Sequence, residues 1–113
     1  MTIQEIAQCV KGQIVVDNPS AHVESAYTSD LLSDIMGHCG DASVLITIQN
    51  HLNAVAVCTL AGIEVIVICH DRPIPDDMAH AAQDEGVGII VTGLSQFEAS
   101  KALAHLAPSK KTL

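Results

Sequence analysis

Largely apolar runs, rich in β-branched residues, alternate with helical patterns along the second half of this chain. The runs occupy residues 44–48, 64–69 and 88–91. The helical patterns cover about 51–62, 75–85 and 95–106. Strands and helices that alternate with short connections form right-handed crossovers on a parallel sheet, so the pattern predicts an α/β fold.

A first helix is predicted close to the start of the chain. Thr2 and Glu5 have the spacing of a capping box, and apolar residues recur with helical periodicity from Ile3 onward. This helix is expected to end by Gly12, and residues 13–16 then read as a short strand before a turn.

A further strand and a short helix are predicted before the alternating region. Residues 22–28 read as the strand, and Ser29 or Asp30 is expected to cap a helix that continues through Met36 and is broken by Gly37. Because the first two strands add mixed edges, we expect about five strands in all, in a mostly parallel sheet with flanking helices.

The helical segment from Leu52 to Ala61 is apolar on every side, since Asn53 and Thr59 are its only polar residues. The positions expected to face the sheet are Leu52, Val55, Ala56, Thr59 and Ile63. The other apolar side chains need a cover that one small domain does not supply, so we predict a homodimer through the 52–61 helix. The alternative is that its small outer residues are simply exposed to water.

Composition and charge narrow the class of protein. With 49% hydrophobic and 2% aromatic residues, the core must be aliphatic, and 113 residues are enough for one domain, residues 1–113. The net charge of −8 excludes a nucleic-acid binder, which needs a basic face, and disfavours anionic membranes. Neither a signal peptide nor a membrane-spanning run is recognisable, so we expect a cytoplasmic protein.

The four cysteines, at positions 9, 39, 58 and 69, are not spaced as C-x-x-C, and we expect reduced thiols without disulfides. His38-Cys39 and Cys69-His70 are candidate metal ligands. Cys39 precedes a predicted strand and Cys69 ends one, so roughly 15 Å separates the two pairs. Zinc ligands lie within about 2.3 Å of the ion, and we therefore predict no metal and no cofactor.

Polar side chains follow the predicted strands at their carboxyl ends, where open parallel sheets bind ligands. Together with Thr47 near the end of its strand and the turn residue Gly93, they are Ser29, Asp30, Gln49, Asn50, His51, Asn53, His70, Asp71, Arg72, Thr92 and Ser95. Several helices begin at the same edge, and their free N–H groups and dipoles favour an anion. We therefore predict a site for a small anion or a nucleotide.

Some of these residues also have an ordinary structural interpretation. Asp30 and Ser95 are typical helix N-caps, and Thr92-Gly93 is typical of a turn between a strand and a helix. His51 and Asn53 are harder to explain by packing, because they begin an otherwise apolar helix. No P-loop, dinucleotide motif, nucleophile elbow or zinc-protease motif is present, so no catalytic residue is predicted.

Two segments resemble the DRTGG domain family, and more narrowly its small stand-alone members labelled HPr serine kinase-like. They are Ser29–Asp34, with the sequence SDLLSD, and Leu45–Val57, with the sequence LITIQNHLNAVAV. The resemblance covers about residues 2–106. At 49–52 this chain has Gln-Asn-His-Leu, and the Asp-Arg-Thr-Gly-Gly stretch that names the family is absent.

The resemblance implies a fold like the N-terminal domain of HPr kinase and the uridine-nucleotide-binding domain of Mur ligases. It also implies a dimerising regulatory role, and a redox-complex partner, since stand-alone members tend to occur beside iron hydrogenase genes. Kinase activity is not expected, because without a P-loop nothing holds Mg-ATP.

Two hypotheses follow. The first is a non-enzymatic, dimeric regulatory module that senses a nucleotide or a phosphorylated metabolite. The second is an accessory factor or enzyme that acts with an iron hydrogenase or another redox complex, with His51 as an acid–base or ligand residue. Thermal-shift screening with nucleotides separates them, because ligand at 100 times its Kd stabilises a protein by about 2.7 kcal/mol.

Overall fold

The computed structural model describes residues 1–108, which form a six-stranded sheet in the order β1-β5-β4-β3-β2-β6. The strands are β1 Gln13–Val16, β2 Ser25–Thr28, β3 Val44–Thr47, β4 Val65–Ile68, β5 Gly88–Val91 and β6 Ala107–Pro108. Strands β2 to β5 are parallel to their neighbours, as is β6 to β2, whereas β1 is antiparallel to β5. This mostly parallel sheet with one antiparallel edge confirms the predicted α/β fold.

One edge of the sheet differs from the prediction. Strand β2 begins at Ser25 and not at residue 22, because the Val23 N–H donates to the Met1 carbonyl (2.8 Å) and not to a neighbouring strand. The helix expected over 95–106 ends at Ala102, and the chain then turns back so that Ala107 N donates to Glu24 O (3.2 Å). This return creates β6, the sixth strand, which the sequence pattern did not predict.

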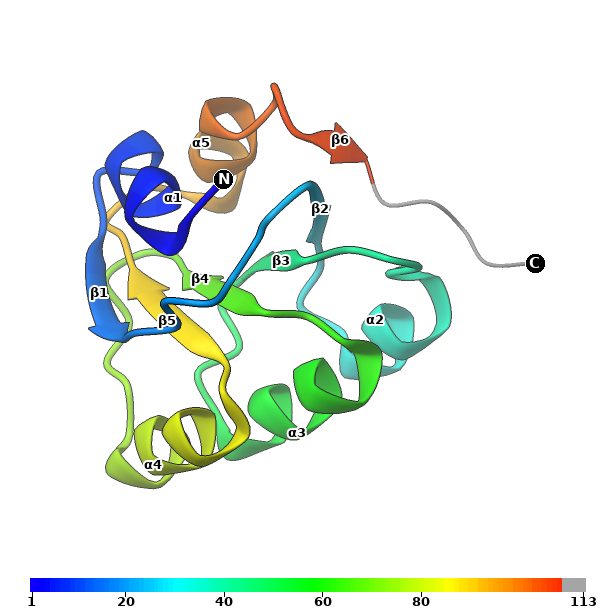
Figure 1. Ribbon diagram of the computed structural model, residues 1–113, viewed down its shortest axis with the longest axis vertical. Coiled ribbons are helices and arrows are strands. Elements are labelled where there is room, and N and C mark those ends of the chain that lie inside the picture. Colours follow the sequence, from blue (N-terminus) through cyan, green and yellow to red (C-terminus); the bar gives the residue numbers. More distant parts are fainter. Residues whose placement is uncertain (109–113) are drawn as a thin grey trace.

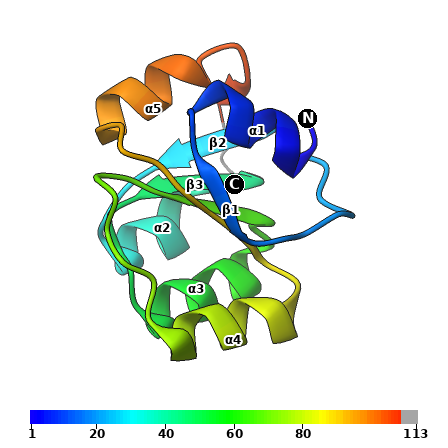
Figure 2. The same cartoon turned by 90° about the vertical axis from the view of Figure 1, so that its left-hand side faces the viewer.

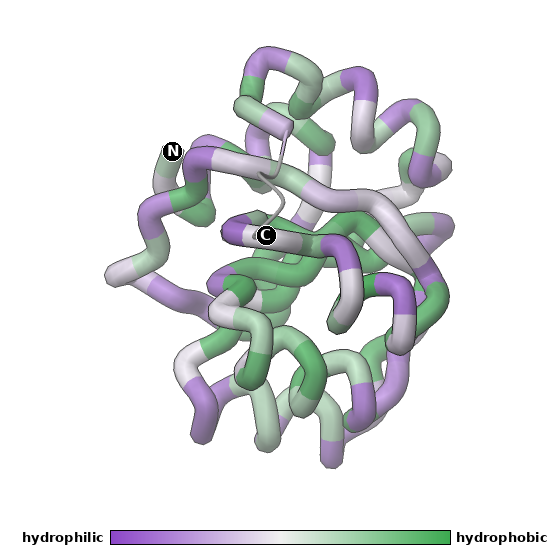
Figure 3. Tube along the Cα trace, turned by 90° about the vertical axis from the view of Figure 1, so that its right-hand side faces the viewer, coloured by the Kyte–Doolittle hydropathy of each residue, from purple (hydrophilic) through white to green (hydrophobic). Residues whose placement is uncertain are grey.

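Helices cover both faces of the sheet (Figures 1 and 2). One face carries α1 Ile3–Cys9 and α5 Gln96–Ala102, and the other carries α2 Leu32–His38, α3 Leu52–Ala61 and α4 Asp76–Glu85. Alternate strand residues enter two separate cores, so that Ile46 packs with α1 and α5 while Leu45 packs with α2 and α3. Figure 3 shows the strongly hydrophobic strands between the two helical layers. None of the helices within residues 1–108 is long and apolar enough to cross a membrane.

Local signals determine where most helices begin. The predicted capping boxes are present: Glu5 N donates to Thr2 Oγ1 (3.2 Å) in α1, and Glu98 N donates to Ser95 Oγ (3.1 Å) in α5. Pro75 is the N-cap of α4 and not, as predicted, its first helical residue. The extended backbone of Pro75 (ψ 149°) places it just outside the helix.

The short helix α2 departs from the prediction at both ends. Its N-cap is Leu31, and neither Ser29 nor Asp30 caps it. It also continues through Gly37 to His38, because the His38 ring bonds Asp34 one turn earlier (3.0 Å) and supports the last turn.

Helix α3 turns a different face to the sheet than predicted. Its buried residues are Ala54, Val55 and Cys58, while Leu52, Ala56 and Thr59 are exposed, so Val55 and the following Ile63 alone were placed correctly. A helix that is apolar on every side has no hydrophobic periodicity to set its rotation, and tertiary packing decides it. The outer face exposes Leu60, with 78% of its surface accessible.

Candidate functional site

The sequence-predicted site residues lie where strands β2 to β5 end, which we call the carboxyl edge. Hydrogen bonds divide them into groups. One group surrounds Asp30, a second joins the loops after β4 and β5, a third contains Arg72, and the last lines a cleft at the start of α3.

Asp30 is an internal anchor that ties β2 to the loop after β3. Its Oδ1 accepts hydrogen bonds from Thr47 Oγ1 (3.0 Å) and Ile48 N (2.9 Å). The same oxygen accepts from Gln96 Nε2 (2.8 Å), and Gln49 Nε2 donates to the Asp30 carbonyl (2.7 Å). Thr47 is fully buried, so its hydroxyl does not face a ligand. Gln96 was missed from the sequence because it lies 66 residues from Asp30 and follows an ordinary N-cap.

The loops after β4 and β5 are joined and strained. His70 and Asp71 have φ values of 61° and 51°, a left-handed conformation that costs roughly 1–3 kcal/mol for each non-glycine residue. Asp71 N donates to Thr92 O (2.9 Å), and a Cβ on Gly93 would lie 2.9 Å from Asp71 Oδ2. The Thr92 hydroxyl is buried and donates to Val10 O (2.6 Å), so it supports the loop from inside.

The strained turn places the Arg72 guanidinium against the neighbouring β3–α3 loop. Arg72 Nη2 donates to Asn50 Oδ1 (3.0 Å), and Asn50 Nδ2 donates to Pro73 O (2.8 Å). Arg72 Nε is buried and, among residues 1–108, has no hydrogen-bond partner. A guanidinium with one anchored and one unsatisfied donor is suited to bind a carboxylate or a phosphate.

His51 and Asn53 lie in a cleft of ≈ 340 Å³ between the starts of α3 and α4, together with Leu52, Pro75 and Asp77. His51 is the N-cap of α3, but its side chain makes no capping hydrogen bond, and both His51 and Asn53 are exposed. The N-cap of α4, Pro75, likewise makes no side-chain capping hydrogen bond. The N–H groups of Ala54 and Met78 have acceptors, His51 O (2.9 Å) and Asp77 Oδ1 (2.8 Å), so the first two N–H groups of each ten-residue helix are the ones left without an intrahelical acceptor at this cleft.

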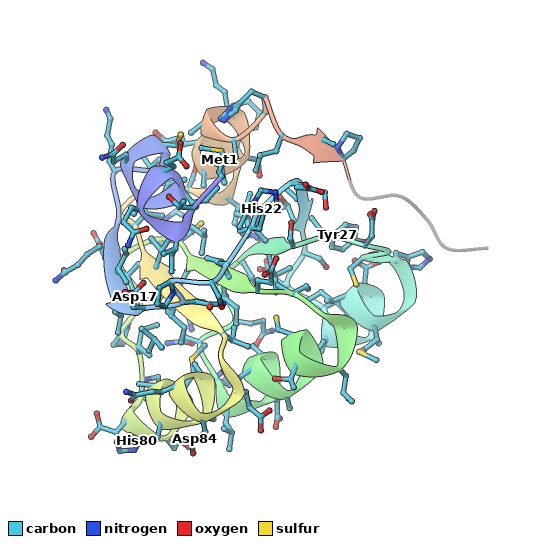
Figure 4. The ribbon with its side chains drawn as sticks, in the orientation of Figure 1. Met1, Asp17, His22, Tyr27, His80 and Asp84 are labelled. Carbon is cyan, nitrogen blue, oxygen red and sulfur yellow. The ribbon has the colours of Figure 1, made fainter. Side chains whose placement is uncertain are left out.

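A polar cluster that the sequence did not reveal lies between β2 and α2, where Figure 4 shows Tyr27 beside the helix. Tyr27 Oη donates to Asp34 Oδ2 (2.7 Å), and the His38 ring bonds Asp34 Oδ1 (3.0 Å). The hydrogen bond to Asp34 raises the pKa of Tyr27 to about 12. Hydrogen bonds from Ser29 and Tyr27 lower the pKa of Asp34. Tyr27 is therefore held as a neutral phenol.

The three buried cysteines are unsuited to nucleophilic chemistry at neutral pH. All four are unpaired, and Cys39, Cys58 and Cys69 are buried. Burial raises the pKa of Cys58 to about 12, and burial together with the charge of Asp30 raises the pKa of Cys69 to about 11. Cys39 and Cys69 belong to cores on opposite faces of the sheet. In the described part of the chain, no three His, Cys, Asp or Glu side chains are grouped so as to hold a metal.

A further cleft, of ≈ 420 Å³, lies at the opposite edge of the sheet. Its lining includes Glu24, Asp41 and Glu64, with His22 bonded to Glu24 (3.0 Å). Carboxylates repel an anionic ligand, so this cleft does not fit the nucleotide or phosphate chemistry predicted for the protein.

The fold is similar to that of a solved regulatory region. This structure contains the CBS and DRTGG domains of a Clostridium perfringens pyrophosphatase complexed with its activator, diadenosine tetraphosphate. The TM-score is 0.78 over 95% of this chain, at 11% sequence identity, and the chain spans 47% of the other. No family model and no curated protein matches the sequence. At this identity the likeness establishes the fold, and the chain has the α/β architecture found in that CBS–DRTGG region.

Proposed function

We propose that this chain, as one module over residues 1–113, is a non-enzymatic regulatory domain that binds a nucleotide or another phosphate ester at the carboxyl edge. The observation that carries the proposal is the Arg72 guanidinium, which is anchored by Asn50 and keeps a buried donor unsatisfied. A buried donor without a partner costs about 1–3 kcal/mol, and a movement of the Arg72 side chain that brings Nε to an incoming acceptor would recover this cost.

The neighbouring cleft supplies the remaining contacts. Asn50, which holds Arg72, directly precedes His51 in the β3–α3 loop, so the guanidinium and the cleft share one loop. The uncapped N-terminus of α3 adds N–H donors and a positive dipole end. His51 and Asn53 offer an imidazole and an amide that make no hydrogen bond within the described chain.

Asp77 opposes this preference, because its carboxylate lines the same cleft. It lies in the first turn of α4, where a negative charge favours the helix dipole. An anionic ligand must therefore compete with Asp77 for the same positive field. The proposal therefore predicts two opposite effects: removal of the Arg72 charge should weaken anion binding, and removal of the Asp77 charge should strengthen it.

The fold comparison supports the ligand class. The similar Clostridium perfringens regulatory region binds diadenosine tetraphosphate, and we extend to this chain the general role of nucleotide sensing. The same likeness supports the DRTGG-like fold that the resemblance of segments Ser29–Asp34 and Leu45–Val57 implies.

Calorimetric titration with ATP, AMP and diadenosine tetraphosphate tests the proposal. Arg72→Gln should weaken binding about 10- to 100-fold, the equivalent of a hydrogen bond to a charged group. Asp77→Asn should tighten it. The matched control is His22→Gln, at the acidic opposite edge, which should leave the affinity unchanged. Absence of binding, or equal effects of Arg72→Gln and His22→Gln, would contradict the proposal.

His51 and Asn53 are expected to affect binding and not folding. Both side chains are exposed and unbonded, so His51→Ala and Asn53→Ala should leave the melting temperature nearly unchanged while they weaken nucleotide binding. A large loss of stability with unaltered binding would assign both residues to the structure instead.

We also propose that the module is a homodimer through α3. The helix contains no charged residue, and it lines an apolar groove of ≈ 350 Å³ along α4 beneath the exposed Leu60. Contiguous exposed apolar surface marks sites of protein–protein contact. The redox-complex partner implied by the family resemblance remains a prediction, with His51, the exposed imidazole of the cleft, as its acid–base or ligand residue.

A further inference from the structure

We propose that a second copy of this chain packs antiparallel against α3, so that the partner's Leu60 closes the cleft formed by His51 and Asn53. The proposal rests on the function proposed for that cleft. It adds that each ligand site is completed by the other subunit, and it therefore links ligand binding to dimerisation.

The exposed residues of α3 match those of a second α3 helix that runs in the opposite direction. They are Leu52, Asn53, Ala56, Thr59 and Leu60. When the helix is reversed about Ala56, Leu52 lies opposite the partner's Leu60 and Asn53 lies opposite the partner's Thr59. Apolar residues thus meet apolar ones and polar residues meet polar ones, as a two-fold symmetric interface requires.

The centre of this surface permits close contact. Ala56 has the smallest side chain of the set and lies one turn from both Leu52 and Leu60. Small residues at a crossing allow helix axes to approach to about 8 Å, at the short end of the usual range. The groove between α3 and α4, lined by Val55 and Ala81 among others, then receives the partner's Leu60.

Charge explains why the occupant is a second copy. The chain has a net charge of −8, so a basic partner would bind its carboxylates and not a helix without charges. Two acidic copies approach with least repulsion along α3, which has no charged residue, and the Glu85 carboxylate at the edge of the groove is the one charge that lines it. Antiparallel packing also places the positive end of each helix dipole beside the negative end of its neighbour.

The consequence for the site follows from the position of Leu52. Leu52 lines both the groove that faces the partner and the cleft that contains His51 and Asn53. A side chain that packs on Leu52 therefore lies at the mouth of the cleft. The partner's Leu60 would exclude water there and strengthen the polar contacts to a bound anion.

Cross-linking through one added, exposed cysteine per variant tests the orientation, with the buried Cys39, Cys58 and Cys69 left in place. In a Cys9→Ser background, Leu52→Cys and Leu60→Cys are prepared separately and mixed, and a short bis-maleimide is added. Antiparallel packing predicts cross-linked dimers in the mixture and none in either variant alone. Val15→Cys, on the exposed edge of the sheet, should not cross-link in any mixture. Cross-links within each variant alone, or none at all, would overturn the proposal.

Chemical modification of His51 tests closure without any ligand. Diethyl pyrocarbonate should modify His51 several-fold faster in Leu60→Glu than in the wild type, whereas His105, which contacts Met1 on the other side of the sheet (Figure 4), should react equally. Phe97→Glu is the matched control, because Phe97 is also 78% exposed but lies on α5. It should remain dimeric by light scattering, with His51 protected.

The two proposals can fail separately. If ATP, AMP and diadenosine tetraphosphate all fail to bind the wild type while His51 stays protected, the proposed function is wrong and the dimer geometry stands. If nucleotide binds equally well to the wild type and to Leu60→Glu, or if His51 reacts equally in both, the completed site is wrong and the proposed function stands.

Discussion

Replacement of Asp30 is the most direct test of how the carboxyl edge is held. Asp30→Ala removes the acceptor shared by the Thr47 hydroxyl, the Ile48 N–H and the Gln96 amide. Thr47 is fully buried, so its hydroxyl has no access to water, and its orphaned donor costs about 1–3 kcal/mol. Gln96 is partly exposed and can turn to water at little cost.

The magnitude follows from these three donors. The Ile48 N–H loses a charged acceptor worth about 1.5–3 kcal/mol, part of which water restores because Asp30 itself is half-buried. We therefore expect Asp30→Ala to lower the free energy of unfolding by about 2–4 kcal/mol. Asp30→Asn keeps an oxygen in place and loses only the charge, so it should cost about 1 kcal/mol.

Urea unfolding followed by circular dichroism measures the effect. A loss of 2–4 kcal/mol moves the midpoint by about 1–2 M at the slope usual for small domains. Asp84→Ala, on the outer side of α4 (Figure 4), is the control and should change stability by no more than about 0.5 kcal/mol. The reasoning is refuted if Asp30→Ala resembles Asp84→Ala, or if Asn is as damaging as Ala at position 30.

Three other expectations can be checked quickly. Absorbance titration of the single tyrosine should give a midpoint near 12 in the folded protein, and Asp34→Asn should bring it toward 10. Because the folded pKa of Tyr27 is raised, its contribution to stability is complete below pH 10 and is lost as the pH rises toward 12. A thiol reagent at neutral pH should label the partly exposed Cys9 quickly and the three buried thiols only after unfolding; fast labelling of Cys69 would contradict its raised pKa. Gly12→Ala should lower the urea midpoint measurably, since the added Cβ would lie 2.9 Å from the Val91 carbonyl oxygen. An unchanged midpoint would show that the backbone of β1 and β5 can move apart to accommodate the added methyl group.

The sequence predicted the features that depend on local signals. The capping boxes at Thr2 and Ser95 are where their spacing placed them, and the β-branched runs at β3, β4 and β5 form the parallel centre of the sheet. These features were predictable because neighbouring residues alone determine them.

Long-range contacts account for what the sequence did not predict. The partners of the Asp30 carboxylate lie 17, 18 and 66 residues away, so a residue that resembles an N-cap acts as an internal anchor instead. The rotation of α3 was unpredictable because Leu52 and Val55 are equally apolar while only one of them is buried. The unsatisfied Nε of Arg72 depends on a strained turn at His70 and Asp71 that no sequence motif marks.

The pairing of the first strand with β5 has a consequence for biosynthesis. Gln13 pairs with Val91, so β1 has no partner until the ribosome has delivered β5. The apolar side of α1, with Ile3, Ile6 and Val10, shares its core with Ile90 of β5 and Leu103, so its cover is also incomplete until then. The native sheet therefore closes late and over a long sequence separation, which slows folding. A chain that stops before residue 88 leaves β1 without a partner and exposes the edge of β4 that β5 covers, and is expected to aggregate and be degraded.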